Sequence, residues 1–173
     1  MSGLDDTINA GLELTGDPSP LQRRMIVQLI AASCEACQVE SGVIEVGVSF
    51  VDVEEIADLN REHRNVDAAT DVLSFPIDAR DPLPAELPRQ LGDLVICTPV
   101  VLEQLAAGET MVPRSGGTGD ATLERALARC VVHGALHLLG EDHEIGEVAA
   151  LRMFELEERA LHQAGFGDDS GSE

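Results

Sequence analysis

Three histidines stand within eleven residues of one another, at His133, His137 and His143. His133 and His137 are four residues apart, so on a helix their imidazoles lie one turn apart on the same face. Gly140 follows, and a glycine there can adopt the positive φ that ends a helix and turns the chain back. Such a turn can bring His143 to the same place. The spacing therefore predicts three imidazole ligands for one metal ion.

A site with three histidines has a specific chemical consequence. Three protein ligands leave the fourth position of a tetrahedral zinc ion open, which is typical of catalytic sites and not of structural ones. Water at such a position has a pKa near ~7 and serves as a nucleophile at neutral pH. Because nitrogen ligands suit zinc, we expect one divalent ion per chain, with Zn²⁺ as the expected metal.

The ligand spacing equals that of the metzincin proteases, HExxHxxGxxH. Those enzymes carry a glutamate general base directly after the first ligand, whereas this chain has Gly134. Peptide hydrolysis by that route therefore lacks its proton acceptor. Acids near the third ligand can substitute for it, so a metzincin-like peptide hydrolase remains as the weaker alternative. These acids are Glu141, Asp142 and Glu144.

A second dense stretch of polar residues precedes the histidines. It contains LNREHR over residues 59–64 and TDVLSFP over residues 70–76. A guanidinium such as that of Arg64 can hold a phosphate through two parallel hydrogen bonds beside a metal ion. The alternative for Arg64 is an ordinary surface ion pair, and these residues by themselves do not decide between the two.

Helices and strands are both expected around these motifs. Helical spacing of apolar residues predicts helices over residues 20–37, 53–62 and 99–108. A nearly continuous apolar run predicts a buried helix over residues 126–139, with Asp120 as a candidate N-cap. Strands are expected over residues 8–14, 42–53, 72–75 and 94–97, and loops over residues 77–91 and 113–119. The sequence thus predicts a domain of mixed α and β structure.

Length and composition limit the function. The chain has 173 residues, the length of one domain, and a net charge of −21 from 32 acidic and 11 basic residues, all of them arginine. A broad basic surface for nucleic acid is therefore excluded. With four phenylalanines and no tyrosine or tryptophan, base-stacking platforms of several aromatics are nearly excluded too. The excess of acidic residues indicates one of two things: a surface that keeps the protein in solution, or adaptation to a cytoplasm with a high salt concentration.

Four cysteines and the lack of a secretory pattern in residues 1–20 predict a reducing, cytoplasmic location. Cys34 and Cys37 form an isolated CxxC inside an expected helix, where we expect two half-buried thiols. No apolar run reaches the ~18 residues of a membrane helix, so no membrane association is expected.

Together the two motifs resemble a known family. The segment HGALHLLGEDH at residues 133–143 resembles the HGxLHLxGxDH signature of the YbeY family. The segments at residues 59–64 and 70–76 resemble its second signature, and GDLVI at residues 92–96 resembles its GDI-type strand. The order and separation of the motifs also agree. The similarity covers roughly residues 8–165.

This resemblance implies a fold, an activity and partners. The implied fold is α+β, with a mixed sheet of about four strands packed around a central buried helix that carries the histidines. Residues 1–165 would form a single metalloendoribonuclease domain, and residues 166–173 an acidic, flexible tail. The implied activity is metal-dependent cleavage of single-stranded RNA in ribosomal RNA processing, including maturation of the 16S rRNA 3′ end, and in ribosome quality control. The implied partners are ribosomal RNA, the small ribosomal subunit, one of its proteins and an Era-type GTPase.

Carried over residue by residue, the resemblance makes His133, His137 and His143 the metal ligands and Arg64 the functional arginine of the cleft. All four are the catalytic residues that we expect. The chain departs from the family pattern at His63, where a tyrosine is usual, and in a loop insertion at residues 109–119. The alternative to an enzyme is a ribosome assembly factor in which the metal ion is only structural.

Overall fold

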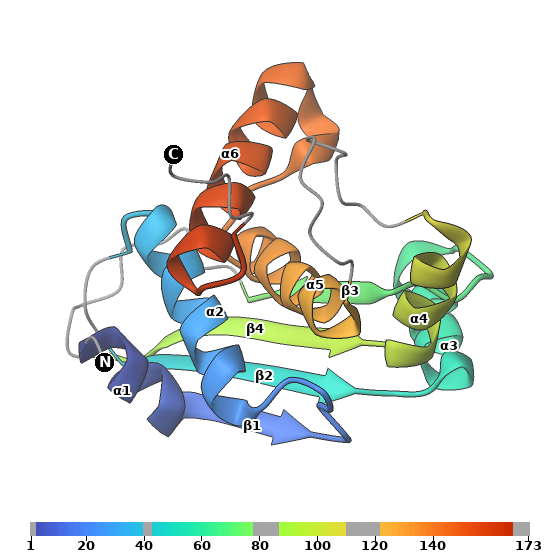
Figure 1. Ribbon diagram of the computed structural model, residues 1–173, viewed down its shortest axis with the longest axis horizontal. Coiled ribbons are helices and arrows are strands. Elements are labelled where there is room, and N and C mark those ends of the chain that lie inside the picture. Colours follow the sequence, from blue (N-terminus) through green and yellow to red (C-terminus); the bar gives the residue numbers. More distant parts are fainter. Residues whose placement is uncertain (1–2, 40–42, 78–86, 110–121, 168–173) are drawn as a thin grey trace.

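The computed structural model describes residues 3–39, 43–77, 87–109 and 122–167. Over these residues the chain forms a four-stranded mixed sheet and six α-helices, which confirms the predicted α+β fold (Figure 1). In chain order the elements are α1 (Gly3–Gly11), β1 (Leu12–Thr15), α2 (Arg23–Ala36), β2 (Ile44–Phe50), α3 (Val53–Arg64), β3 (Val72–Pro76), β4 (Arg89–Ile96), α4 (Thr98–Ala107), α5 (Leu123–Leu138), the 3₁₀ turn η1 (His143–Ile145) and α6 (Glu147–Gln163).

The strand order in the sheet is β1-β2-β4-β3. Strands β1, β2 and β4 run parallel, and β3 pairs antiparallel with β4 at one edge. Because successive side chains of a strand point to opposite sides, the two faces of the sheet contribute to two separate hydrophobic clusters. On one face, Leu94 and Ile96 of β4 belong to the main core with α2 and α5. On the other face, Val95 packs with Leu73 of β3 and Ile56 of α3.

Helix α5 is the central buried helix that its apolar sequence predicts. It packs against β3 and β4 on one side and against α2 and α6 on the others (Figure 1). Its side chains are buried along almost the whole length, from Ala126 to Leu138. A helix in this position holds whatever polar groups it carries at fixed points relative to the sheet.

The ends of α5 are defined by side-chain and backbone hydrogen bonds. Thr122 is the N-cap, and its hydroxyl accepts a hydrogen bond from the backbone N–H of Arg125 at 3.3 Å. Asp120, the expected cap, lies outside the described residues. At the other end Gly140 has φ of 91°, and the Glu141 N–H bonds the Leu136 carbonyl at 3.0 Å. This Schellman-type ending confirms the turn predicted at Gly140.

Two expectations about the elements were wrong. Residues 8–14 were expected to form a strand, but α1 continues to Gly11 and only Leu12–Thr15 pair with β2. Ile8 lies on that helix and is fully buried, so this apolar residue packs into the core from a helix and not from a strand. Residues 77–91 were expected to be loop throughout, whereas β4 already begins at Arg89 and is extended by pairing with β2.

The expected loop at residues 113–119 and most of the expected tail at residues 166–173 lie outside the described residues. Phe166, which is described, packs partly buried against the main core.

Candidate metal centre

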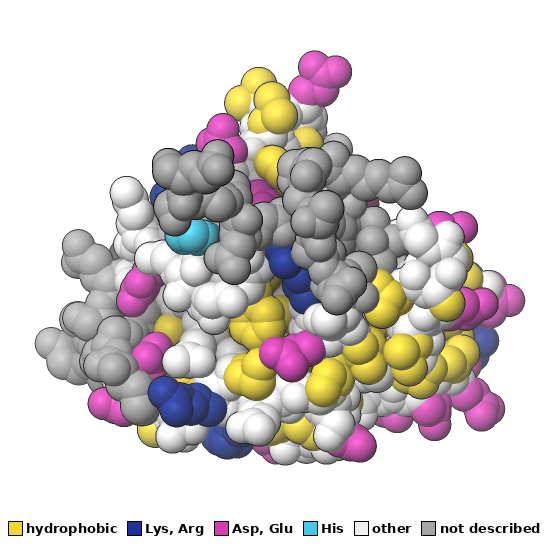
Figure 2. Space-filling view, in the orientation of Figure 1, with side chains coloured by type: hydrophobic (Ala, Val, Ile, Leu, Met, Phe, Trp, Pro, Cys, Tyr) yellow, Lys and Arg dark blue, Asp and Glu magenta, His cyan; other side chains and the backbone are white. Residues whose placement is uncertain are grey.

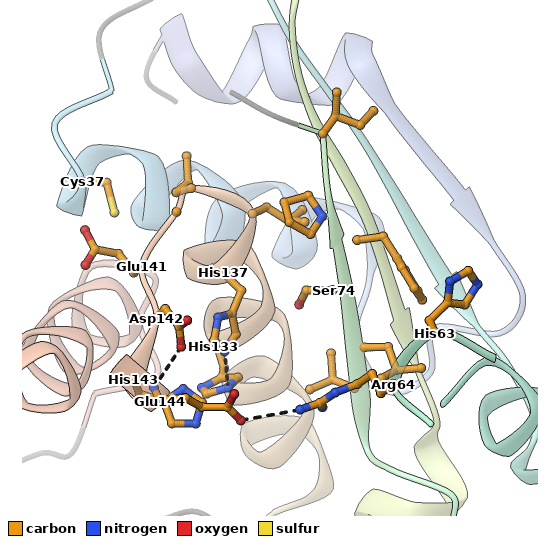
Figure 3. A pocket seen from close by; sticks show the side chains of 18 of the residues that line it. Cys37, His63, Arg64, Ser74, His133, His137, Glu141, Asp142, His143 and Glu144 are labelled. Carbon is orange, nitrogen blue, oxygen red and sulfur yellow. Dashed lines mark hydrogen bonds and ion pairs between the residues drawn. The ribbon is translucent and has the colours of Figure 1, made fainter. Parts of the chain in front are cut away.

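The three predicted ligands converge at the C-terminal end of α5. His133 and His137 lie on one face of the helix, and His143 follows at the start of η1. The ring centroids are 4.7 Å apart for His133 and His137, and 5.1 Å from His143 to each of them. One ligand nitrogen from each ring lies within 4.8 Å of the others. Figure 3 shows the three rings facing a common point.

The donor set fits a divalent ion. The Nε2 atoms of His133 and His137 are 3.1 Å apart. Two nitrogen ligands of a tetrahedral zinc ion with Zn–N distances of ~2.05 Å would be about 3.3 Å apart. Burial lowers the pKa of His137, and the neighbouring His133 and His143 lower it further. A lowered pKa keeps the imidazole neutral, which is the form that binds metal.

A buried carboxylate orients the first ligand. Glu157 of α6 is 8% exposed, and its Oε1 lies 2.6 Å from His133 Nδ1. A carboxylate at that nitrogen accepts its proton, which leaves Nε2 free to face the metal position. Arg129 in turn donates to Glu157 Oε2 at 3.2 Å and to Glu158 Oε1 at 2.7 Å. Arg129, Glu157 and His133 thus form a connected polar network beneath the site.

Glu157 was not predicted from the sequence, although a signal for it exists. Met153, Leu156, Ala160 and Leu161 form the buried face of α6. Glu157 lies in the middle of that face by helical spacing, so an acid there must be buried and needs a partner.

Gly134 explains why the glutamate of metzincins is missing. A Cβ atom at this position would lie 2.7 Å from Leu94 Cδ2 and 3.2 Å from Ser74 Oγ. The Ser74 hydroxyl also donates to the Gly134 carbonyl at 3.3 Å. The position therefore faces the sheet at close approach, and a glutamate side chain has no room there.

Arg64 reaches the same site from α3. That helix begins at its N-cap Asp52 and ends at Asn65, which adopts the left-handed conformation with φ of 57°. Arg64 is therefore in the last turn, and its Nη2 lies 3.5 Å from Glu144 Oε1 beside His143. The arginine side chain is 53% exposed, so it remains open to solvent and to a ligand.

Arg64 and the histidines line one groove of about 1270 Å³. The groove follows β3 and is closed on the other side by the end of α5 and the end of α2 (Figure 3). The structure thus brings together all four predicted site residues. His63 also lines the groove and packs edge-on against Phe75, with 4.9 Å between the ring centroids. His162, by contrast, is exposed on α6.

The acids near the third ligand have different surroundings. Glu141 forms two hydrogen bonds of 2.9 Å with Arg152 and is therefore engaged. Asp142 accepts a hydrogen bond from the backbone N–H of Glu144 at 2.9 Å and shapes the turn at His143. Glu144 is 66% exposed and contacts Arg64. Of the three, Glu144 alone is exposed, and its side chain contacts Arg64 in the groove.

The cysteines are not part of the donor set. Burial raises the pKa of Cys34 to about 12 and that of Cys37 to about 11. Both are free thiols, Cys34 fully buried and Cys37 partly buried. This agrees with two packed thiols, although Cys34 is more buried than expected.

Among the described residues, no helix is long and apolar enough to span a membrane.

Known proteins match this chain over most of its length. The family model described as "Endoribonuclease YbeY" matches residues 17–165. A protein named "Endoribonuclease YbeY" from Cellvibrio japonicus is 41% identical over 143 residues, which is 83% of this chain and 71% of the relative. One of the same name from Geobacillus thermodenitrificans is 36% identical over 160 residues, 89% of this chain and 94% of the relative.

A similar fold is found in a solved structure. The solution structure of TM1509 from Thermotoga maritima superposes with a TM-score of 0.54 at 25% sequence identity, covering 94% of this chain and 99% of that one.

Proposed function

Because the chain belongs to the endoribonuclease YbeY family, we propose that it is a metal-dependent endoribonuclease that cleaves single-stranded RNA. The observation that carries this proposal is the convergence of His133, His137 and His143 in a groove that also holds Arg64. A donor set of three imidazole nitrogens next to an exposed guanidinium suits an anionic substrate that has to be both bound and polarised.

The proposed roles follow from position. His133, His137 and His143 hold one divalent ion, for which Zn²⁺ is the proposed identity. The ion supplies Lewis acidity and lowers the pKa of water. Arg64 binds the phosphate that is cut and neutralises the charge that develops on it. To do so it exchanges its contact with Glu144 for the phosphate, and this frees Glu144 to accept a proton near His143.

The finer cellular role is also a proposal. The substrate that the family implies is ribosomal RNA, in 16S rRNA 3′-end maturation and in ribosome quality control. The small ribosomal subunit, one of its proteins and an Era-type GTPase are the proposed partners, in the cytoplasm. The net charge of −21 favours RNA that is held at a few points in the groove, because the sequence has no basic stretch for a broad RNA-binding surface.

Arg64→Ala distinguishes an enzyme from an assembly factor with a structural metal. An enzyme loses RNA turnover by about 100-fold or more while metal content and subunit binding stay near wild type. Arg61→Ala is the matched control, since Arg61 lies on the same helix and pairs with Asp58 and Asp67 away from the histidines. Normal cleavage by Arg64→Ala would favour the assembly factor. The peptide hydrolase is disfavoured because Gly134 faces the sheet.

A further inference from the structure

Arg64 lies at one end of the groove, and the groove continues on the other side of the histidines. Its described lining follows β3 (Val72–Pro76) as far as Ile77 and includes Cys37 and Val39, which follow the end of α2. In Figure 3, Cys37 lies on the far side of the histidines from Arg64. At ~3.3 Å per residue, the five residues of β3 span about 13 Å. A stacked strand rises ~3.4 Å per nucleotide, so this length holds about four nucleotides.

Arg89 lies at the α2 end of this groove. It is the first residue of β4, and it lines the groove together with Cys37. Its neighbour in the sheet is Ile44, which is buried in the main core, so both residues lie on the face that carries α2 and α5. The Ile77 N–H bonds the Leu91 carbonyl at 3.2 Å, which places Arg89 just beyond the end of β3.

Among the residues that the structure describes, Arg89 has no partner for its charge. Arg64 contacts Glu144, and Arg152 contacts Glu141. Within the part of the chain that the structure describes, the Arg89 side chain forms neither an ion pair nor a hydrogen bond, although it is partly buried. A guanidinium that is partly removed from water and left unpaired is costly. An anion bound in the groove would recover that cost, and a guanidinium matches phosphate geometry well.

Other unpaired arginines do not share this position. Arg24 and Arg159 also lack a polar partner within the described ranges, but both are exposed and neither lines the groove. On the face shown in Figure 2, acidic side chains are scattered with few arginines among them. The chain has a net charge of −21, so the positive charge of Arg89 in the groove is a local feature that attracts an anion.

We propose that Arg89 binds a backbone phosphate of the RNA on the opposite side of the metal centre from Arg64. This inference rests on the proposed function and adds a second phosphate site to it. A single strand would then be held on both sides of the cut. The preferred substrate is single-stranded RNA of about four or more nucleotides, because a dinucleotide cannot reach both arginines.

The test compares Arg89→Gln with Arg24→Gln on two substrates, a dinucleotide and a single-stranded decanucleotide. For the decanucleotide, Arg89→Gln is expected to raise KM about tenfold with kcat within about twofold of wild type. The slope of log KM against log salt should also fall by about 0.7, the value for one phosphate contact on a single strand. The dinucleotide should not distinguish the two variants. Arg89→Lys should recover part of the lost affinity.

Two results would overturn the inference. One is a KM for the decanucleotide that is the same in Arg89→Gln and Arg24→Gln. The other concerns the wild type alone, and is a KM for the decanucleotide that is no lower than the KM for the dinucleotide. If metal-loaded wild type cleaves neither substrate, the proposed function fails by itself. Fluorescence anisotropy of a labelled decanucleotide then decides the Arg89 site, since Arg89→Gln must still bind more weakly than Arg24→Gln.

Discussion

Glu157 Oε1 lies 2.6 Å from His133 Nδ1, and this contact joins helix α6 to the metal-binding face of α5. The contact defines which nitrogen of His133 carries the proton and which one faces the other two histidines. Arg129 donates to the second oxygen of Glu157, so the carboxylate keeps its position. The geometry of the first ligand therefore depends on a residue 24 positions further along the chain.

Replacing Glu157 should weaken metal binding. Glu157→Gln keeps the shape but removes the charge that favours the Nδ1–H form, and we expect the dissociation constant of the metal to rise about 10- to 100-fold. Competition with a chromogenic chelator measures it. Glu155→Gln is the control, because Glu155 is exposed on the same helix. Equal metal affinity in the two variants would show that Glu157 does not orient the ligand.

Gly134 should resist even a single added methyl group. Alanine normally stabilises a helix by ~1 kcal/mol relative to glycine. Here its Cβ would lie 2.7 Å from Leu94 Cδ2, so we expect Gly134→Ala to lower the free energy of unfolding by about 1–3 kcal/mol. Urea denaturation measures the change. A double-mutant cycle with Leu94→Ala should show that the two effects are coupled. A stabilised Gly134→Ala variant would contradict the close approach.

The metal-free protein should lose stability as the pH falls. The pKa of His137 is lowered in the fold, mainly by burial, from its ordinary value of 6.5. Between the folded and unfolded pKa values the unfolded chain binds more protons, so the contribution of His137 to stability is present above about pH 6.5 and is lost on acidification. Denaturation at pH 7.5 and 5.5 measures it.

His137→Gln should remove part of this dependence on pH, whereas His162→Gln should not, since His162 is exposed at the end of α6. The two variants isolate His137 from the general change in charge of an acidic protein. A pH dependence that is the same in wild type and His137→Gln would refute the assignment.

RNA cleavage should depend only weakly on salt. In the proposed binding mode Arg64 and Arg89 make two phosphate contacts, which gives a slope of about −1.4 in a plot of log affinity against log salt. Screening also reduces the repulsion between RNA and the acidic surface, because the screening length falls from ~8 Å at physiological salt to ~3 Å at 1 M. Between 50 and 200 mM KCl the two contacts alone lower the affinity about sevenfold, against about 10³-fold or more for a protein with six or more phosphate contacts, and the weaker repulsion offsets part of this loss. Cleavage rates over this range of KCl measure the dependence. Steep inhibition by modest KCl would count against a narrow site.

The sequence predicted the metal centre better than the groove around it. Histidine spacing and the glycine turn are local features, so His133, His137 and His143 could be read along the chain. Glu157 and Arg89 depend on packing between elements distant in sequence, which local patterns do not encode. The prediction of a strand at residues 8–14 was wrong because a short apolar run with Ile8 and Leu12 fits a helix followed by a strand equally well.

The fold was predictable where the pattern was long. The buried α5 and the strands β2 and β3 follow from sustained periodicity or β-branched residues. The early start of β4 was not predictable, because Arg89 and Gln90 have weak strand propensity and join the sheet by pairing with Ile44 and Glu45.

Metal titration decides whether RNA is cleaved at a metal ion held by the three histidines. Protein stripped of metal by a chelator, with its residual metal content measured, should be inactive on single-stranded RNA. Adding back Zn²⁺ should restore cleavage in proportion to bound metal, with saturation at one ion per chain. The variant His133→Ala/His137→Ala should bind no ion and stay inactive. Full-rate cleavage by the metal-free protein would contradict the account.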